Sequence, residues 1–465
     1  MTKWARTLLL VAGLAVVLGW KATLSYRDHG AARAEAGAAG CASEPGDDDR
    51  PAEILTRVDN ADEPLMLVPA SVLAGASLPS PGGIEGRIRL WEAVFGEYDN
   101  NYIIIFNRER PGVIYDAIFD LPGRKQAVIT RLRPMLKTLD QISRKSADPL
   151  AEINERPDGP ELAALYQKFA YLHNPEKFAR AALPGHIGSL RGRKNELIQA
   201  YQLAAPYLPV MEEMFRDQGL PPDLTRLVFV ESMFDRRARS SAGAVGVWQF
   251  LPSAARPYLV MTTAIDERRD PIAATRAAAY ILKRDHQRLK TWPLAVTAYN
   301  AGTARMIKAM NRTGADSLAQ LINEYDYRDI GFSVENFYAK LIAVIRVEKK
   351  LGLKNQLSPV AATPLDYDLV SLPRAYTLNQ LSRELGMSTT ILVSMNPAWT
   401  DAVENSWTAA PKGYLLRVPK GSIELVKATL GIIDTAPLPG GVTAGSPPAL
   451  IPTSSVLEVR GTDLK

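Results

Sequence analysis

The sequence has little of the residues that metal and thiol sites need, with one cysteine and four histidines in 465 residues. A sole cysteine, Cys41, excludes an intramolecular disulfide and a thiolate metal cluster. The histidines lack the His-x-x-x-His spacing of zinc hydrolases; they are His29, His173, His186 and His286. A Gly-x-Ser-x-Gly elbow and a Gly-x-x-x-x-Gly-Lys phosphate loop are also missing. We therefore expect no metal or cofactor, and neither nucleotide nor acyl-transfer chemistry.

The charged residues are mixed in sign and contain no long Lys/Arg block. The formal net charge is +5 and the isoelectric point is near 9.0. Without a basic tract, no nucleic-acid partner is expected, whereas an anionic polymer and an anionic membrane surface would suit this charge equally well. Hydrophobic residues make up 46% of the chain, as in ordinary globular proteins, and the length allows two or three domains.

Residues 1–24 are typical of an export signal or a membrane anchor. Lys3 and Arg6 precede the apolar run Leu8–Trp20, which is short for a membrane span of roughly 20 residues. A small-x-small cleavage site is missing directly after it, so cleaved and anchored forms both stay open. Lipidation at Cys41 is less favoured, because about twenty small or polar residues separate that cysteine from the apolar run. The sequence thus predicts a periplasmic, envelope location.

Composition and periodicity divide the rest of the chain into five parts. Residues 25–85 are rich in Ala, Gly, Pro and Asp and are expected to form a disordered tether. Residues 86–190 are mostly helical in pattern, interrupted by the strand-like run Tyr102–Phe106, and are expected to be a helical scaffold. Residues 190–350 have only helical patterns. Residues 365–421 read as a small β-α-α-β domain, and residues 430–465 as a disordered tail. The predicted fold class is mainly α.

One carboxylate, Glu231, lies on an apolar helical face. Counting back three, four and seven residues reaches Val228, Leu227 and Leu224, all apolar. Burying a lone charge is costly, so such a carboxyl either pairs with a cation or stays protonated, as an acid catalyst must. A structural ion pair is an equal alternative, with partners from Arg236, Arg237 and Arg239.

The segment after Glu231 could bind a sugar. Small residues and two glycines in Arg239–Gly246 let the backbone approach a ligand closely. Trp248 then supplies an aromatic ring and Gln249 an amide, while core packing is the competing interpretation for Trp248 and Phe250. Further candidates are Tyr299 and Asn300, at a predicted helix end, and Tyr338. A usual glycosidase needs a second carboxylate, and no other one here has a setting like that of Glu231.

Four ordered motifs, "ESMFDRRARSSAGAVGVWQFLP", "DERRDP", "AYNAG" and "ENFYAKLIAV", resemble the lytic transglycosylase domain of glycoside hydrolase family 23 over residues 190–350. That family has an all-α fold similar to goose-type lysozyme. The resemblance implies that Glu231 is the sole catalytic acid/base. It also implies substrate contacts by the residues that match the motifs: Ser232, Gln249, Tyr299, Asn300 and Tyr338.

The reaction implied by the resemblance is cleavage of the β-1,4 bond between N-acetylmuramic acid and N-acetylglucosamine in peptidoglycan strands. Glu231 would protonate the leaving oxygen and then act as a base, so that the sugar's own 6-hydroxyl attacks and leaves a 1,6-anhydromuramoyl end. Such a mechanism needs no second carboxylate. Two alternatives are a muramidase that admits water, and a wall-binding protein that has lost activity.

The β-α-α-β unit resembles a LysM peptidoglycan-binding module through "LNQLSRELGMSTTILVSMNP" and "PKGYLLRVP". The family's Gly-Asp-Thr before the first helix is replaced here by Pro373–Thr377 ("PRAYT"). The resemblance therefore implies a degenerate LysM-like domain.

Overall fold

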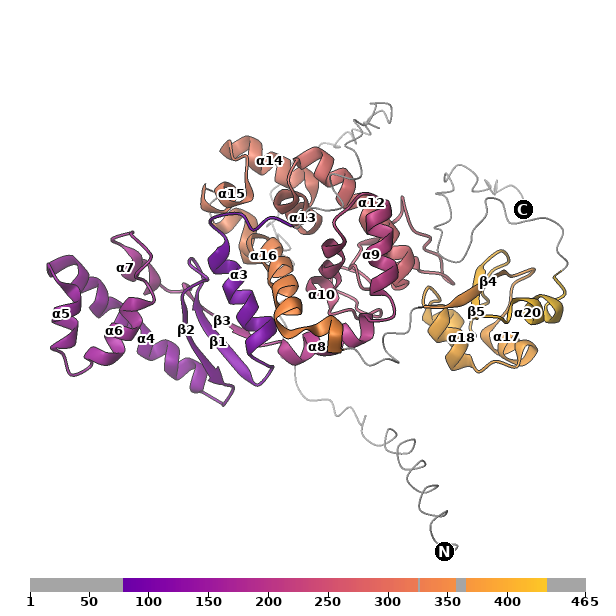
Figure 1. Cartoon of the computed structure of the whole chain (residues 1–465), viewed down its shortest axis with the longest axis horizontal. Helices are drawn as coiled ribbons and strands as arrows, with labels where there is room; N and C mark the ends of the chain where they lie inside the picture. The colour runs from indigo at the N-terminus through magenta and orange to yellow at the C-terminus, as the bar shows by residue number, and fades with distance from the viewer. Residues whose placement is uncertain (1–77, 325–326, 357–364, 433–465) are drawn as a thin grey trace, which may run out of the picture. The chain divides into compact units, whose positions relative to one another are not determined.

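The computed structural model describes residues 78–324, 327–356 and 365–432 (Figure 1). These residues belong to one of two units into which the chain divides, Pro51–Lys465. The segment 1–24, most of the tether and nearly all of the predicted tail lie outside the described residues. Within the described ranges, no helix has both the length and the apolar character of a membrane span.

Within residues 192–324 and 327–356 all the regular elements are helices, as the sequence predicts, so the described chain is mainly α. Asp270 caps one long helix by accepting the N–H of Ile272 at 2.9 Å, with Pro271 in the first turn. The elements are α8 Lys194–Ala204, α9 Leu208–Asp217, η2 Pro222–Arg226, α10 Leu227–Ser232, α11 Pro252–Ala255, η3 Glu267–Arg269, α12 Pro271–Leu289, α13 Trp292–Ala301, α14 Thr303–Thr313, α15 Leu318–Glu324, α16 Tyr327–Leu351 and η4 Leu353–Gln356.

The region before residue 192 is not purely helical, which corrects the expectation of a helical scaffold. Its strands form one antiparallel sheet in the order β2-β1-β3: β1 Tyr102–Asn107, β2 Ile114–Phe119 and β3 Ile187–Arg191. Its helices are α3 Glu85–Glu92, the π-helical turn η1 Ala93–Glu97, α4 Arg124–Lys145, α5 Pro149–Asn154, α6 Gly159–Gln167 and α7 Lys177–Ala181. The sequence shows β1 as an apolar run, whereas β2 and β3 are less apolar and were missed.

Strand β1 is apolar up to its last residue, Asn107, because it contributes to two cores. Ile103 and Ile105 pack with helices α4 to α7 in one core, and Ile104 and Phe106 pack in the main core. Alternate residues of a strand face opposite sides, so a strand buried on both sides needs apolar residues at every position.

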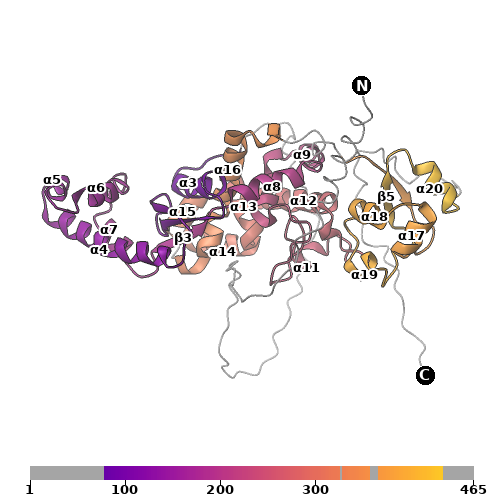
Figure 2. The same cartoon turned by 90° about the horizontal axis from the view of Figure 1, so that it is seen from below.

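Helix α3 also belongs to the main core and lies along α16 (Figure 2). The chain just before it, expected to be part of the tether, contributes Leu78 and Ile84, which are 9% and 1% exposed. The main core therefore begins well before residue 190, because α3 and its flanking residues fill space that the middle helices leave open.

The C-terminal unit has the expected β-α-α-β order. Strands β4 Tyr367–Ser371 and β5 Leu415–Pro419 pair antiparallel, and α17 Leu378–Leu385 and α18 Thr389–Met395 lie between them in sequence. A capping box between Thr377 and Gln380 begins α17. Two short helices, α19 Asp401–Glu404 and α20 Ile423–Thr429, were not expected. Because α20 supplies Val426 to this core, the unit extends past residue 421.

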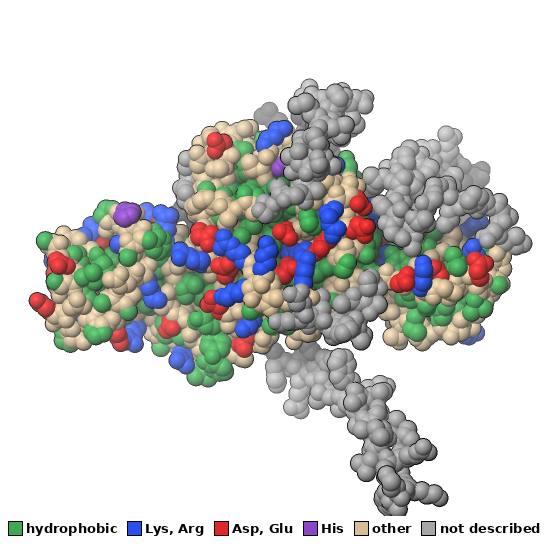
Figure 3. Space-filling model, viewed as in Figure 1, with side chains coloured by type: hydrophobic (Ala, Val, Ile, Leu, Met, Phe, Trp, Pro, Cys, Tyr) green, Lys and Arg blue, Asp and Glu red, His purple; other side chains and the backbone are tan. Residues whose placement is uncertain are grey.

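Charges of both signs are interspersed over the face of the molecule drawn in Figure 3, matching the mixed charge of the sequence.

Candidate active site

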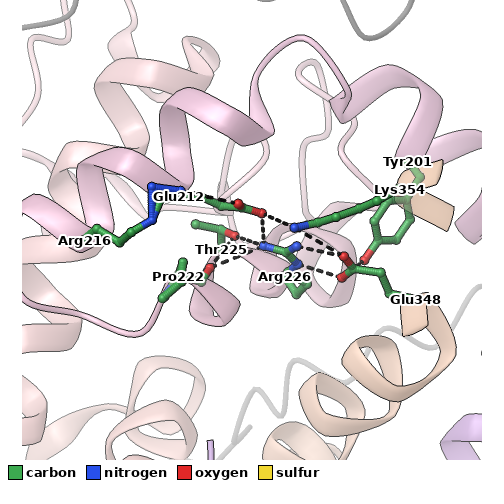
Figure 4. Close-up of polar contacts among 8 residues, drawn as sticks. All are labelled: Tyr201, Glu212, Arg216, Pro222, Thr225, Arg226, Glu348 and Lys354. Atoms are coloured by element: carbon green, nitrogen blue, oxygen red, sulfur yellow. Dashed lines mark hydrogen bonds and ion pairs between the residues drawn. The ribbon is translucent and has the colours of Figure 1, made fainter. Parts of the chain in front are cut away.

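A buried ionic network fixes the start of the helix that carries Glu231. Arg226 is 1% exposed and donates to both carboxylate oxygens of Glu348 at 2.8 Å (Figure 4). It also pairs with Glu212 at 2.5 Å, and Tyr201 donates to Glu348 at 2.7 Å. These contacts join η2, which ends at Arg226, to α8, α9 and α16. Since Arg226 directly precedes α10, the network ties the helix of Glu231 to three distant segments.

Helix α10 is short and ends directly after Glu231 and Ser232. Met233 and Phe234 both adopt left-handed backbone conformations, with φ of 51° and 59°. Non-glycine residues rarely occupy this region, and clusters of such residues are typical of functional sites. Phe234 is 2% exposed and packs in the main core, so its burial offsets the strain. The sharp turn ends the helix with Glu231 in its last turn.

The Glu231 carboxyl is surrounded by protein, although the residue keeps part of its surface exposed. Burial raises its pKa to about 8, against the opposing attraction of the Lys340 ammonium. At neutral pH the carboxyl therefore holds its proton. The helical face predicted for Glu231 is confirmed, since Leu224, Leu227 and Val228 are all fully buried.

Two of the three arginine partners considered for Glu231 contact other residues. Arg236 donates to the hydroxyl of Tyr207 at 2.9 Å, and Arg237 pairs with Glu404 at 2.6 Å. The cation that acts on Glu231 is instead Lys340, on α16. A simple structural ion pair with one of these arginines therefore does not account for Glu231.

Ser232 connects α10 to the segment that contains Trp248. Its hydroxyl lies 3.2 Å from the carbonyl oxygen of Val228 and 3.0 Å from that of Val247. In this arrangement the hydroxyl is engaged with backbone and joins the Glu231 helix to the neighbouring loop.

Trp248 and Phe250 lie in the core, so the stacking role suggested for Trp248 is corrected. Trp248 is fully buried, donates through Nε1 to Thr275 Oγ1 at 2.9 Å, and stacks on Phe215. Phe250 is 3% exposed. A ring must present a face at a surface to stack on a sugar, and Trp248 is covered by α9 and α12. Core packing is the correct interpretation of both rings.

Gln249 sits on a tightly constrained loop. Its φ is 50°, and its amide donates to the carbonyl of Gly246 at 2.9 Å. Gly246 has φ of 79°, and a Cβ there would lie 1.9 Å from the carbonyl oxygen of Arg268. Arg268 in turn donates to the carbonyls of Gly243 and Phe250. The glycine is thus required by close backbone contact, and the loop is held at both ends.

Tyr299 is the predicted residue that the structure brings to Glu231. Its hydroxyl donates to the Trp248 carbonyl at 2.8 Å. Its pKa is raised by burial and further by the Glu231 carboxyl. Asn300 follows at the end of α13 and is exposed.

Tyr338 has a different environment from Tyr299. It is fully buried, and its hydroxyl donates to the Pro79 carbonyl at 2.7 Å. Burial raises its pKa, and Glu231 is not among the causes of that shift. The structure therefore places the Tyr338 hydroxyl against the N-terminal segment.

Lys340 is a site residue that the sequence analysis missed. It is the lone charge in the apolar run Phe337–Ile345, the same signal that marked Glu231. Burial lowers its pKa to about 8, opposed by Glu231 and reinforced by the cation of Arg193.

Among the described residues, no group of three His, Cys, Asp or Glu side chains is arranged to hold a metal ion.

Comparison with known families identifies the region that contains this site. The model of the transglycosylase SLT domain matches residues 210–322. The chain contains a transglycosylase SLT domain. The match includes Glu231, the Trp248 loop and Tyr299, whereas Tyr338 and Lys340 lie beyond it.

The chain is similar to membrane-bound lytic murein transglycosylase D of Escherichia coli (strain K12), with 28% identity over 265 residues. This match covers 56% of each protein, so the chain spans little more than half the length of that relative. A putative tributyltin chloride resistance protein of Alteromonas sp. (strain M-1) is 33% identical over 110 residues, 23% of this chain and 53% of that protein.

A solved structure of an inactive mutant of lytic transglycosylase Slt from Pseudomonas aeruginosa also matches. The match covers 48% of this chain and 38% of that one, at 16% identity. Its TM-score of 0.27 does not establish a common fold.

Proposed function

We propose that this chain is a peptidoglycan lytic transglycosylase that cleaves the MurNAc–GlcNAc β-1,4 bond, with Glu231 as its sole acid/base. The observation that carries the proposal is the state of the Glu231 carboxyl. Burial raises its pKa to about 8, so it is protonated at neutral pH and able to give a proton to a leaving oxygen. The SLT domain match over residues 210–322 and the similarity to the lytic murein transglycosylase D of E. coli support the substrate class.

The chemistry requires one carboxyl in two roles. Glu231 gives its proton to the glycosidic oxygen as the bond from that oxygen to C1 of the muramoyl sugar breaks. The sugar's N-acetyl group stabilises the positive charge that develops at C1. The Glu231 carboxylate then takes the proton of the 6-hydroxyl as O6 bonds to C1, which closes the anhydro ring and restores the acid. No net proton is consumed.

The electrostatic neighbours support a mechanism with a single carboxylate. Among the described residues, the groups whose charges couple to Glu231 are Lys340 and Tyr299, and neither is a carboxylate. A retaining hydrolase would place a second carboxylate about 5 Å away, and an inverting one roughly 6.5–9.5 Å away. The neighbours of Glu231 therefore favour internal attack over activation of water by another carboxylate.

Roles for the other residues follow from their placement. Ser232 and Gln249 hold the backbone around the carboxyl, and Asn300 is exposed at the end of α13, where it can reach a sugar amide. The domain limits, the assignment of the C-terminal unit as a LysM-like module and an envelope location are part of the same proposal. An envelope location is supported by residues 1–24 and by the membrane-bound E. coli relative.

Digestion of purified peptidoglycan, followed by mass spectrometry of the fragments, tests the proposal. Anhydromuramoyl ends are expected. Reducing ends would replace the proposal with a muramidase, and no cleavage would indicate a wall-binding protein. The Glu231→Gln variant keeps the size and hydrogen bonding of the side chain without a transferable acid proton, so we expect at least a 1,000-fold loss of turnover with unchanged circular dichroism. Near-normal turnover by this variant would contradict the assigned role.

A further inference from the structure

Lys340 is held in place by Trp91, from the region that the sequence predicted to be a helical scaffold. Its Nζ lies 4.6 Å from the centre of the Trp91 ring. The same indole donates through Nε1 to Asn336 Oδ1 at 3.1 Å. Asn336 and Lys340 are four residues apart, so they lie one turn apart on the same face of α16. Trp91 therefore contacts both, and its ring fixes the direction of the lysine.

Both residues that contact each other beside Lys340, Trp91 and Asn336, are themselves fixed by packing. Trp91 is 6% exposed and packs against Phe95 at 5.4 Å. Asn336 is fully buried, and its amide also donates to the carbonyl of Phe332 at 2.7 Å. A cation over an aromatic face is attracted by the ring, and more strongly where water is excluded. The ammonium is thereby stabilised in a buried place where it would otherwise lose its proton.

The charged groups around this cation are few. Glu231 on α10 attracts it, and Arg193 at the start of α8 opposes its charge. Arg193 is itself paired with Glu196 at 2.6 Å, which reduces its effect. Facing Glu231 are Lys340 and Tyr299, on α16 and α13. The pair Glu231–Lys340 is therefore the main electrostatic coupling of the site, and helices α10 and α16 pack directly on each other.

We propose that Lys340, held over the Trp91 ring, is a positioning residue whose cation controls when the Glu231 carboxyl becomes charged. The inference rests on the acid/base role proposed for Glu231. When Glu231 gives up its proton, a carboxylate forms beside the ammonium. The attraction exists only after the proton leaves, so it stabilises the transition state more than the resting acid.

The contact of α3 with α16 brings Trp91 to Lys340. Without the Trp91 ring, the flexible lysine side chain would lose its fixed direction and its stabilisation as a cation. The part of the chain before the SLT domain therefore completes the site.

The pH dependence of kcat/KM on soluble glycan strands tests this inference. Removing the cation in Lys340→Met raises the pKa of Glu231, because an opposite charge no longer favours the carboxylate. The alkaline limb of the profile is expected to move up by about one pH unit, while kcat at the optimum falls at least tenfold and KM stays within twofold. Lys340→Arg keeps a cation and should restore the wild-type alkaline limb. Trp91→Leu should give an intermediate shift.

Lys350→Met is the matched control, because Lys350 lies on the same helix, is largely exposed and pairs with Glu97 at 3.7 Å. It should leave the profile unchanged. If Lys340→Met does not fold, Lys340→Gln provides the same comparison.

Two results would overturn the inference. If folded Lys340→Met, or Lys340→Gln in its place, has the wild-type pH dependence of kcat/KM, the cation does not act on Glu231. A large rise in KM with an unshifted limb would assign Lys340 to binding a substrate carboxylate instead. Failure of the proposed function is seen separately, as absent anhydro products from the wild type or an active Glu231→Gln variant.

Discussion

The state of Glu231 makes a prediction about stability that is independent of any substrate. The carboxyl has a pKa of about 8 in the folded protein and 4.5 as its reference value. Between these values the folded form holds a proton that the unfolded form has released, so stability falls as pH rises through this window. Glutamine cannot ionise and escapes this cost. Glu231→Gln is therefore expected to be more stable than the wild type at neutral pH.

The size of the effect follows from the same two values. At pH 7, about 2.5 pH units above the reference, linkage gives an upper limit of about 3 kcal/mol. Because glutamine also buries an amide, and because the carboxyl keeps some contact with solvent, we expect a gain of about 2 kcal/mol. The gain should disappear as the pH approaches 4.5, where the carboxyl is protonated in part even when unfolded.

Urea unfolding of both proteins at pH 7 and at pH 4.5, followed by circular dichroism, measures this difference. Equal stabilities at pH 7 would show that the carboxyl is not held protonated by burial. A gain of the same size at both pH values would attribute the effect to packing. Either result would refute the reasoning, and with it the basis for Glu231 as a resting acid.

Two further predictions concern the structures that hold the site. Arg226→Met leaves Glu348 and Glu212 buried without their main cation and should lower the free energy of unfolding in urea by about 3–5 kcal/mol. The control Arg346→Met removes an exposed pair with Glu85 and should lower it by at most about 1 kcal/mol. Equal losses in the two variants would show that burial does not strengthen the network. Gly246→Ala places a Cβ against the Arg268 carbonyl and should cost about 3 kcal/mol and most of the activity. Gly243→Ala also has a positive φ but meets no atom within 4 Å, so it should cost only about 1 kcal/mol; similar losses for the two glycines would mean that backbone strain, and not the close contact, dominates.

Local patterns predicted the helices around the site because those patterns depend on neighbours in sequence. Asp270 and Pro271 are where a helix start requires them, and the apolar residues before Glu231 are buried as their spacing predicts. Strand β1 was predicted from its apolar run, because a strand that is buried on both faces is apolar at successive positions. Strands β2 and β3 were missed because each has fewer buried residues, and their pairing with β1 supplies the hydrogen bonds that define them.

The role of an aromatic residue could not be derived from its own segment. Trp248 follows a glycine loop and resembles a ring placed for a ligand, yet Phe215 and Thr275 cover it from two other helices. Tyr338 likewise satisfies its hydroxyl on Pro79, a residue far away in the sequence. Burial depends on every segment that packs against a side chain, and those segments cannot be read from a local motif.

By itself, the sequence determined that Glu231 is a lone carboxylate on an apolar helical face, since helical periodicity decides which neighbours share that face. Only the tertiary structure decided that the cation beside it is Lys340 rather than a nearby arginine, and that Trp91 holds that lysine. The physical reason is that electrostatic coupling depends on distance in space and on exclusion of water. Both are set by the packing of α3, α10 and α16, segments that are remote along the chain.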